Sequence, residues 1–291
     1  MINNFQRSNY FLMLATGAML IGFAPIFVKW SELTPSSILF YRMALTLPFL
    51  FFLNFYLNKK LWFEVKDKKT ILYSALASIA FTFDLVLWHY AMGITSVSNA
   101  TIIVNSAPIL IAVLSYIIFK EKPSKGFAAS FVITYIGIIG LIIYSNNYIN
   151  GKVIGDVLCL FAALGYATYL LIISKLGKET ALNIIFYTTL FCSIFALIPM
   201  FFESGEKFPL SKFEWKNLLL LAFLCQFLGQ AFITYALAYL SASISSLTLL
   251  IQPIAATILG YLFFQEKLNL IQFFGCILIL IGIYIARAKN K

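Results

Sequence analysis

YAMGITSVSNATIIVNSAPILIAVLSYIIFKEK at residues 90–122 is matched by YALAYLSASISSLTLLIQPIAATILGYLFFQEK at residues 235–267. The alignment continues without a gap from 90–138 onto 235–283, at an offset of 145 residues, and 14 of its 49 pairs are identical. Apolar composition alone produces repeated Ile and Leu, but it does not readily produce a matched proline, Glu-Lys and glycine in fixed register. The identical pairs include Pro108/Pro253, Tyr116/Tyr261, Phe119/Phe264, Glu121/Glu266, Lys122/Lys267 and Gly137/Gly282. We infer that the chain contains a duplicated half, as many membrane transporters do.

The rest of the chain is also strongly apolar. Hydrophobic residues make up 62% of its 291 residues and charged residues 11%, which excludes an ordinary soluble domain. A helix needs about 20 apolar residues to cross the hydrocarbon core of a bilayer. Ten stretches meet this requirement: 10–30, 36–57, 70–92, 96–119, 126–145, 155–174, 182–202, 216–238, 242–264 and 269–287. They do not alternate as the strands of a membrane β-barrel would. The predicted fold class is therefore an all-α polytopic membrane protein with ten transmembrane helices.

Basic residues between the predicted helices indicate the orientation of the chain in the membrane. Fourteen Lys and Arg fall in segments on one side and five on the other, leaving out Lys29 and Arg42, which lie within helices or at their edges. Because Lys and Arg are enriched on the cytoplasmic side, both termini are predicted to be cytoplasmic. The net charge of +10 then follows from topology and does not indicate nucleic-acid binding. We expect a multi-pass membrane protein.

The ten predicted helices divide into two repeats of five, residues 1–149 and 150–291. Because five is odd, the second repeat enters the membrane from the opposite side, and the two repeats are inverted. No GxxxxGK[ST] sequence is present, so transport energy would come from an ion gradient, from exchange or from the gradient of the substrate. One chain already holds both repeats, and a monomer could therefore function.

Ionisable residues inside predicted helices are costly and mark candidate sites. Asp84 and Arg42 are expected at similar depth, where they form either a structural salt bridge or a functional pair. In the functional interpretation, Asp84 carries a proton or binds a substrate amine. His89, near the outer boundary, is a weaker candidate for which interfacial packing is the main alternative, and Lys29 is expected to extend to the lipid headgroups.

Uncharged polar residues and two prolines supply further candidates. Gln226, Gln230 and Thr234 recur at i, i+4 and i+8 and should share one helix face, either lining a substrate site or hydrogen-bonding a neighbouring helix. Pro108 and Pro253 each fall midway through a predicted helix. A proline there removes a backbone donor, frees a carbonyl one turn earlier and forms a candidate hinge.

Tryptophan placement leaves two alternatives for one residue. All four tryptophans fall near predicted helix ends, which is typical of the interfacial aromatic belt. Trp88 lies one turn after Asp84, and so it either belongs to this belt or faces the same cavity as Asp84.

The sequences GFAPIFVKW at 22–30 and ILFYRMALTLP at 38–48, together with the repeated proline and Glu-Lys, resemble the EamA family of the drug/metabolite transporter superfamily. The resemblance covers essentially the whole chain. It implies an inner-membrane carrier for small metabolites, often amino acids or their derivatives, with a central cavity between the first, third, fourth, sixth, eighth and ninth helices. Polar and aromatic residues on those helices are our predicted substrate-binding set: Asp84, Trp88, Asn105, Tyr166, Gln226, Gln230 and Gln252.

The leading functional hypothesis is a secondary transporter that moves a small metabolite, foremost an amino acid or amino-acid derivative, by alternating access. The partners expected are the substrate, the lipid bilayer and, as a candidate coupling ion, the proton. A lipid or lipid-linked substrate flippase is the alternative, and it would need a lateral opening between helices. A membrane-embedded enzyme is disfavoured, because the chain has no DxxxD pair, no HExxH sequence and no Ser-His-Asp set at one depth. Neither a cofactor nor a metal site is expected.

Overall fold

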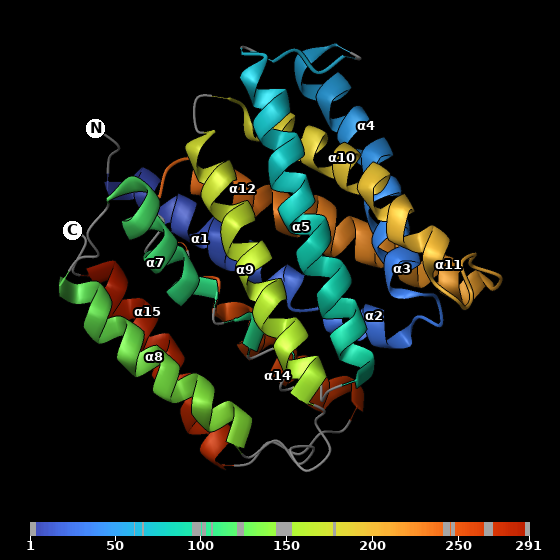
Figure 1. The fold of residues 1–291 in the computed structure, drawn as a ribbon. Coiled ribbons are helices and arrows are strands. Elements are labelled where there is room, and N and C mark those ends of the chain that lie inside the picture. The colour runs from blue at the N-terminus through green and yellow to red at the C-terminus, as the bar shows by residue number, and fades with distance from the viewer. Residues whose placement is uncertain are drawn as a thin grey trace.

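Every regular element in the described part of the chain is a helix, as Figure 1 shows for this computed structural model. The structure describes residues 4–60, 62–65, 67–94, 100, 103–105, 107–120, 125–143, 153–176, 179–240, 245, 248–264 and 270–288.

The helices follow one another along the chain with short connections. The first half contains α1 (Asn4–Ile21), α2 (Ala24–Trp30), α3 (Pro35–Ala44), α4 (Thr46–Asn58), α5 (Lys69–Ile94), α7 (Ala107–Phe119) and α8 (Lys125–Ile143). The second half contains α9 (Val153–Lys175), α10 (Ala181–Phe202), α11 (Lys212–Leu220), the π-helix η2 (Leu221–Gly229), α12 (Gln230–Leu237), α14 (Ile251–Phe264) and α15 (Leu270–Ala288).

Six helical spans in these described ranges are long and apolar enough to cross a membrane. They are Asn9–Trp30, Pro35–Asn58, Lys69–Ile94, Val157–Lys175, Ala181–Phe202 and Lys212–Leu237. Helices α7, α8, α14 and α15, of 13 to 19 residues, coincide with the other four predicted stretches, although α8 begins one residue before its stretch and α15 ends one residue after its own. The chain is therefore a polytopic helical membrane protein.

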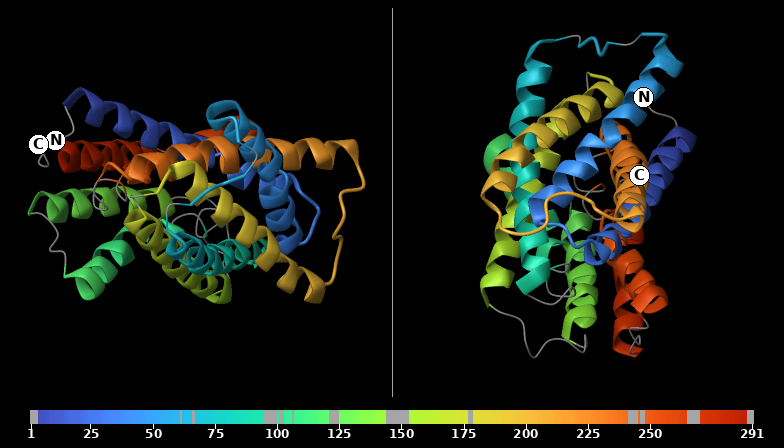
Figure 2. Two further views of the ribbon diagram at one scale, coloured as in Figure 1. Left: turned by 90° about the horizontal axis from the view of Figure 1, so that it is seen from above. Right: turned by 90° about the vertical axis from the view of Figure 1, so that its right-hand side faces the viewer.

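Helices from the two halves of the chain pack against each other throughout the bundle. Helix α5 packs on α9 and α10, while α1 packs on η2, α12 and α14. Helix α3 contacts α10 and η2, and α7 contacts α9. The antiparallel pair of α8 and α15 lies at one edge of the molecule (Figures 1 and 2).

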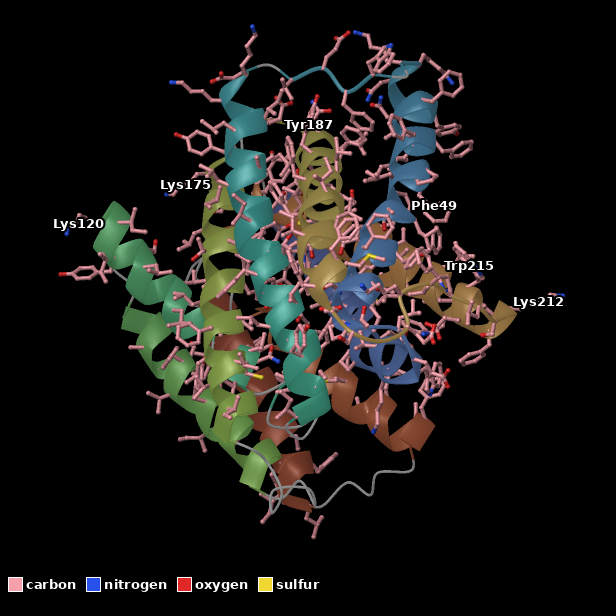
Figure 3. The ribbon with its side chains drawn as sticks, turned by 45° about the vertical axis from the view of Figure 1, so that its right-hand side comes forward. Phe49, Lys120, Lys175, Tyr187, Lys212 and Trp215 are labelled. Atoms are coloured by element: carbon pink, nitrogen blue, oxygen red, sulfur yellow. The ribbon has the colours of Figure 1, made fainter. Side chains whose placement is uncertain are left out.

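The ends of the helices fall on two opposite sides of the bundle. Both chain termini lie on one side in Figure 1. Figure 3 places Lys120 and Lys175 near that side and Lys212 at the opposite side. The positive-inside rule also predicts opposite sides for these lysines.

Two glycines allow helices from different halves to approach closely. A Cβ on Gly165 of α9 would lie 2.8 Å from the Ala80 carbonyl oxygen and 3.2 Å from the Asp84 Cβ on α5. A Cβ on Gly17 of α1 would lie 2.7 Å from the Gly229 carbonyl oxygen on η2. Ordinary contacts of a real Cβ begin near 3.4 Å, so only glycine fits at either position without displacing its neighbour.

The two repeated prolines begin helices and do not kink continuous ones. Pro108 is the second residue of α7 and Pro253 the third of α14. Non-helical turns precede them at Asn105 and at Leu249–Leu250. A proline has no backbone N–H, and the first turn of a helix is where that donor is not needed. The two candidate hinges therefore lie at breaks between helices and not midway through continuous ones.

Candidate functional site

A cavity of about 80 Å³ lies at the centre of the bundle, where α1, α2, α3, α5, α9, α12 and α14 meet the turn before α7. Six of the seven predicted substrate-binding residues line it: Asp84, Trp88, Asn105, Tyr166, Gln230 and Gln252. Its apolar wall includes Ile21, Phe81 and Leu85, and Arg42 adds a cationic group from α3.

Asp84 and Arg42 both face this cavity and are almost fully buried, at 3% and 2% exposure. They interact electrostatically, but no ion pair or hydrogen bond joins them. The interpretation as a direct salt bridge therefore needs correction. Gln226 on η2 holds Arg42, since Arg42 Nε donates to Gln226 Oε1 at 3.1 Å. Asp84 Oδ1 has no hydrogen-bond partner among the described residues.

Gln226 and Gln230 have different neighbours, although the sequence predicted that they share one helix face. Gln226 contacts Arg42 and is not among the cavity-lining residues, whereas Gln230 faces the cavity. Gln230 Nε2 donates to Tyr169 Oη at 2.7 Å, which leaves Gln230 Oε1 as an acceptor without a partner in the described ranges. The two glutamines lie on either side of the end of the π-helix η2 at Gly229. Thr234 continues on α12 as a buried residue near Tyr169.

The break before α14 brings a polar side chain into the cavity. Gln252 lies in the first turn of α14, and its Nε2 has no partner within the described part of the chain. The Tyr166 hydroxyl on α9 lies beside the Gln252 amide. A smaller adjoining cavity of about 20 Å³ is lined by Asn105 and Ala107 on one side and by Leu249 and Gln252 on the other. The starts of α7 and α14 therefore lie close together at the site.

Trp88 and His89 are both buried, which agrees with the cavity alternative for Trp88 and differs from interfacial packing for His89. Trp88 is 8% exposed and lines the cavity, so it is not a belt residue. His89 Nδ1 lies 3.0 Å from the Pro35 carbonyl oxygen and ties α5 to the start of α3. His89 is not among the residues that line the cavity. Lys29 is exposed in the last turn of α2, as expected for a lysine that reaches the headgroups.

A second group of polar contacts, which sequence reasoning missed, joins the two halves at the end of the bundle predicted to be outer. The Glu203 carboxylate accepts hydrogen bonds from the Ser36 backbone N–H at 3.1 Å and from Ser36 Oγ at 2.5 Å. Ser31 Oγ donates to Glu214, and the Thr34 N–H donates to the Glu206 carbonyl at 2.8 Å. Glu203 thereby caps the N-terminus of α3, where a negative charge is favourable. The signal available in the sequence was an acidic residue directly after an apolar run, which is also common at ordinary helix ends.

The size of the cavity limits its ligand in this conformation. A cavity of roughly 150 Å³ accommodates benzene, and sites for drug-sized ligands measure roughly 300–1,000 Å³. At about 80 Å³, the cavity is smaller than either. A ligand must therefore be small, or the helices must move apart to admit it.

Comparisons with a family model and with known proteins all match this chain to transporters. The model of the EamA-like transporter family matches residues 8–143 and again residues 153–288. An "Uncharacterized transporter" of Archaeoglobus fulgidus is 25% identical over 293 residues, covering 98% of this chain and 99% of that protein. A second from the same organism is 25% identical over 211 residues, covering 72% of this chain and 66% of that protein. "Uncharacterized transporter YetK" of Bacillus subtilis is 23% identical, covering 78% and 70%.

A solved structure shares the fold. One crystal-structure chain superposes with a TM-score of 0.77 at 13% sequence identity, covering 96% of this chain and 97% of its own length. At that identity the likeness concerns the fold alone.

Proposed function

Because the chain belongs to the EamA-like transporter family, we propose that it is a secondary transporter whose substrate binds in the central cavity and crosses the membrane by alternating access. The proposed substrate is a small metabolite, foremost an amino acid or amino-acid derivative. The proposed location is the inner membrane, with both termini in the cytoplasm.

One observation carries this proposal: buried polar groups with unused bonding capacity converge on one cavity. Asp84 and Gln230 are each at least 97% buried and line it, and each has an acceptor atom without a partner among the described residues. An unpaired polar atom costs about 1–3 kcal/mol in a protein interior, and more if it is charged. Groups kept at that cost in the membrane interior are expected to serve a substrate or ion path.

The packing of the helices supports the proposed inverted repeats. In the order of the ten predicted spans, α5 and α9 are the third and sixth, while η2–α12 and α1 belong to the eighth and first. In an inverted repeat, each contact between two helices has a counterpart in which each helix is replaced by its equivalent from the other half. The counterpart of the contact between α5 and α9 is the contact between α12 and α1, and both occur. The contact of α7 with α9 likewise becomes that of α14 with α1, which also occurs. Two inverted halves have two near-equivalent packings, one open to each side, and this is the basis of alternating access.

The contacts at the outer end fit a stage of such a cycle in which the two halves are held together on that side. Ser36 and Glu203 belong to different halves, so their hydrogen bonds must break if the halves separate there. We expect the outward-open state to lack these bonds and to have a larger cavity.

Uptake into proteoliposomes tests the proposal, with amino acids, organic acids and nucleosides as solutes and with or without a pH gradient. The test variant is Ala256→Trp, because Ala256 lines the cavity and an indole would fill it. The control is Ile258→Trp on the same helix, since Ile258 is 47% exposed on the outer surface of the bundle.

Saturable uptake that Ala256→Trp abolishes and Ile258→Trp preserves is the expected result. Stimulation by the pH gradient would identify the proton as the coupling ion, and Asp84 is the one carboxylate among the described cavity-lining residues. If both variants transported like the wild type, the cavity would not be the substrate path. If fluorescent lipid were flipped and no solute moved, the flippase alternative would replace the proposal.

A further inference from the structure

The connection between α4 and α5 is fastened to the other half of the chain. We call its residues 59–68 the α4–α5 strap, and Figure 3 shows it at the end of the bundle where Tyr187 is labelled. Phe63 of the strap is buried and stacks on Phe186 of α10, with ring centroids 3.7 Å apart and an interplanar angle of 2°. Tyr187 Oη donates to the Phe63 carbonyl oxygen at 2.8 Å. The strap therefore has a fixed place on the start of α10.

Buried amides hold the backbone of the strap at three more points. Asn54 Nδ2 donates to the carbonyl oxygens of Lys60, at 2.8 Å, and of Trp62, at 3.2 Å. Asn183 Nδ2 on α10 donates to the Glu64 carbonyl oxygen at 2.7 Å. Both asparagines are buried, and buried polar groups of this kind are normally hydrogen-bonded. Together these bonds determine which face of the strap points outward.

The outward face of the strap is aromatic and basic. Trp62, next to the buried Phe63, is 79% exposed. Residues 59–69 contain five lysines and two acidic residues, a net charge of +3. One of the acids, Glu64, forms an ion pair with Lys60 at 2.7 Å, and this pair contributes little energy because both side chains are exposed. The described lysines of this stretch are all exposed: Lys59, Lys60, Lys68 and Lys69.

These lysines lie just beyond side chains that face lipid. Phe52 and Tyr56 of α4 and Leu72 of α5 are exposed side chains on spans long enough to cross a membrane. Lys59 Nζ lies 5.3 Å from the centroid of the Tyr56 ring. Lys69 precedes Leu72 by three residues, or about 4.5 Å along the helix. Lysines so near the hydrocarbon extend their ammonium groups to the headgroups, so the basic face is at headgroup depth.

The lysines at the start of α5 do not serve the stability of that helix. Lys69 is its first residue, and its first turn contains no acidic side chain. A cation there is unfavourable, because the N-terminal end of a helix already carries a partial positive charge. Asp67 Oδ1 accepts a hydrogen bond from the Lys69 N–H at 2.9 Å, which places one negative charge beside Lys68 and Lys69. An additional anion next to these lysines would reduce the remaining repulsion.

We propose that the α4–α5 strap and the start of α5 form a docking surface for the headgroups of anionic phospholipids. The lysines attract the lipid phosphate, and the Trp62 indole enters the membrane interface beside it. This end of the bundle is predicted to be cytoplasmic, and the cytoplasmic leaflet carries anionic lipids. The inference goes beyond the proposed function, because it concerns another part of the molecule and is independent of the solute carried.

Lipid binding to the purified full-length protein in a neutral detergent tests this assignment. The probes are short-chain phosphatidylglycerol, which is anionic, and short-chain phosphatidylcholine, which has no net charge. Binding is measured as the rise of the melting temperature with lipid concentration, since a ligand of the native state stabilises it. A lysine near an anionic lipid surface strengthens binding about fivefold. If two lysines act on one headgroup, phosphatidylglycerol should bind about 25-fold more tightly than phosphatidylcholine.

Two double variants that each remove two positive charges locate the binding surface. Lys68→Gln with Lys69→Gln should remove most of the preference for phosphatidylglycerol and leave phosphatidylcholine binding unchanged. Without lipid, its melting temperature should equal or exceed that of the wild type, because the cations at the start of α5 are gone. The control is Lys212→Gln with Lys216→Gln, since these exposed lysines lie at the other end of the bundle. It should bind both lipids as the wild type does.

Three results would overturn the proposal. Equal binding of the two lipids, or equal effects of the two double variants, would mean that the lysines of the strap only orient the chain in the membrane. Glycerol phosphate that bound as tightly as phosphatidylglycerol would indicate a site for free phosphate. A polyglutamate peptide that bound more tightly than the lipid would indicate an acidic protein partner. None of these measurements involves transport, so the proposed function stands or falls separately.

Discussion

The contact between α5 and α9 at Gly165 offers a sharp test of how the cavity is positioned. Replacing Gly165 with alanine would place a Cβ 2.8 Å from the Ala80 carbonyl oxygen, about 0.6 Å inside the 3.4 Å at which ordinary contacts begin. Backbone atoms cannot rotate away as a flexible side chain can, so the two helices must separate. Overpacking of this kind costs roughly 1–3 kcal/mol. At about 2 °C per kcal/mol for a chain of this length, the melting temperature should fall by roughly 2–6 °C.

A matched control removes the effect of alanine on helix stability. Gly93 also lies in a helix, α5, but a Cβ there would meet no atom within 4 Å. Gly165→Ala gains roughly 0.5–1 kcal/mol of helix propensity inside α9, whereas Gly93→Ala gains less because Gly93 is next to the end of α5, so the difference between the two variants is a lower bound on the cost of the contact. Melting in detergent gives the stability, and binding of the most tightly bound solute gives the effect on the cavity, because Tyr166 follows Gly165 and Asp84 lies opposite.

Gly165→Ala should melt below Gly93→Ala and bind solute more weakly. Equal melting temperatures of the two variants would refute the close approach of α5 and α9 at Gly165. If Gly165→Ala lost stability but kept its affinity, the shape of the cavity would not depend on this contact.

Two further predictions concern the ends of the bundle. Glu203→Gln should lower the free energy of unfolding by about 1–2 kcal/mol, because it removes the charge that caps α3. Its melting temperature is compared with that of Glu32→Gln, whose side chain is exposed. Equal melting temperatures would mean that the cap contributes nothing to stability. Lys120→Cys should react with a membrane-impermeant maleimide added on the cytoplasmic side, and Lys212→Cys with the same reagent added on the outer side, because both lysines are exposed at opposite sides of the bundle (Figure 3). Both variants are made with the native cysteines replaced by alanine. The reverse pattern would invert the predicted orientation.

The position of most cavity residues could be predicted because polar side chains are rare in this chain. In an apolar helix, a residue such as Asp84 or Gln230 stands out, and its distance from the helix end gives its depth. The face of Trp88 was harder to predict, since aromatic and polar side chains occur on several sides of α5 and its hydrophobic periodicity is weak. Packing against both α9 and α10 decides which side becomes interior.

Other features depend on backbone geometry that residue patterns do not reveal. The different neighbours of Gln226 and Gln230 depend on how other helices pack around them, and the residues of Leu221–Gly229 do not predict a π-helix there. The hydrogen bond from Arg42 to Gln226, in place of a direct contact with Asp84, likewise depends on side-chain positions that spacing along the helices does not give. The repeated prolines did mark the helix breaks in the fourth and ninth predicted spans, although the sequence predicted them to lie midway through continuous helices.

The two glycine contacts are where the halves could pivot in the proposed alternating access. Gly165 meets α5 at Asp84, and Gly17 meets η2 at Gly229, which lies 145 residues after Asp84, the offset of the repeat. Each contact joins one half to the other, and neither position has a side chain that would catch during rotation. The end of α5 at Ile94 is ten residues beyond Asp84, or about 15 Å. A tilt of about 10° around these points would therefore move that end by about 2.6 Å while the residues beside the glycines stay almost in place. A small rotation at the centre would thus give a larger displacement at the two ends of the bundle.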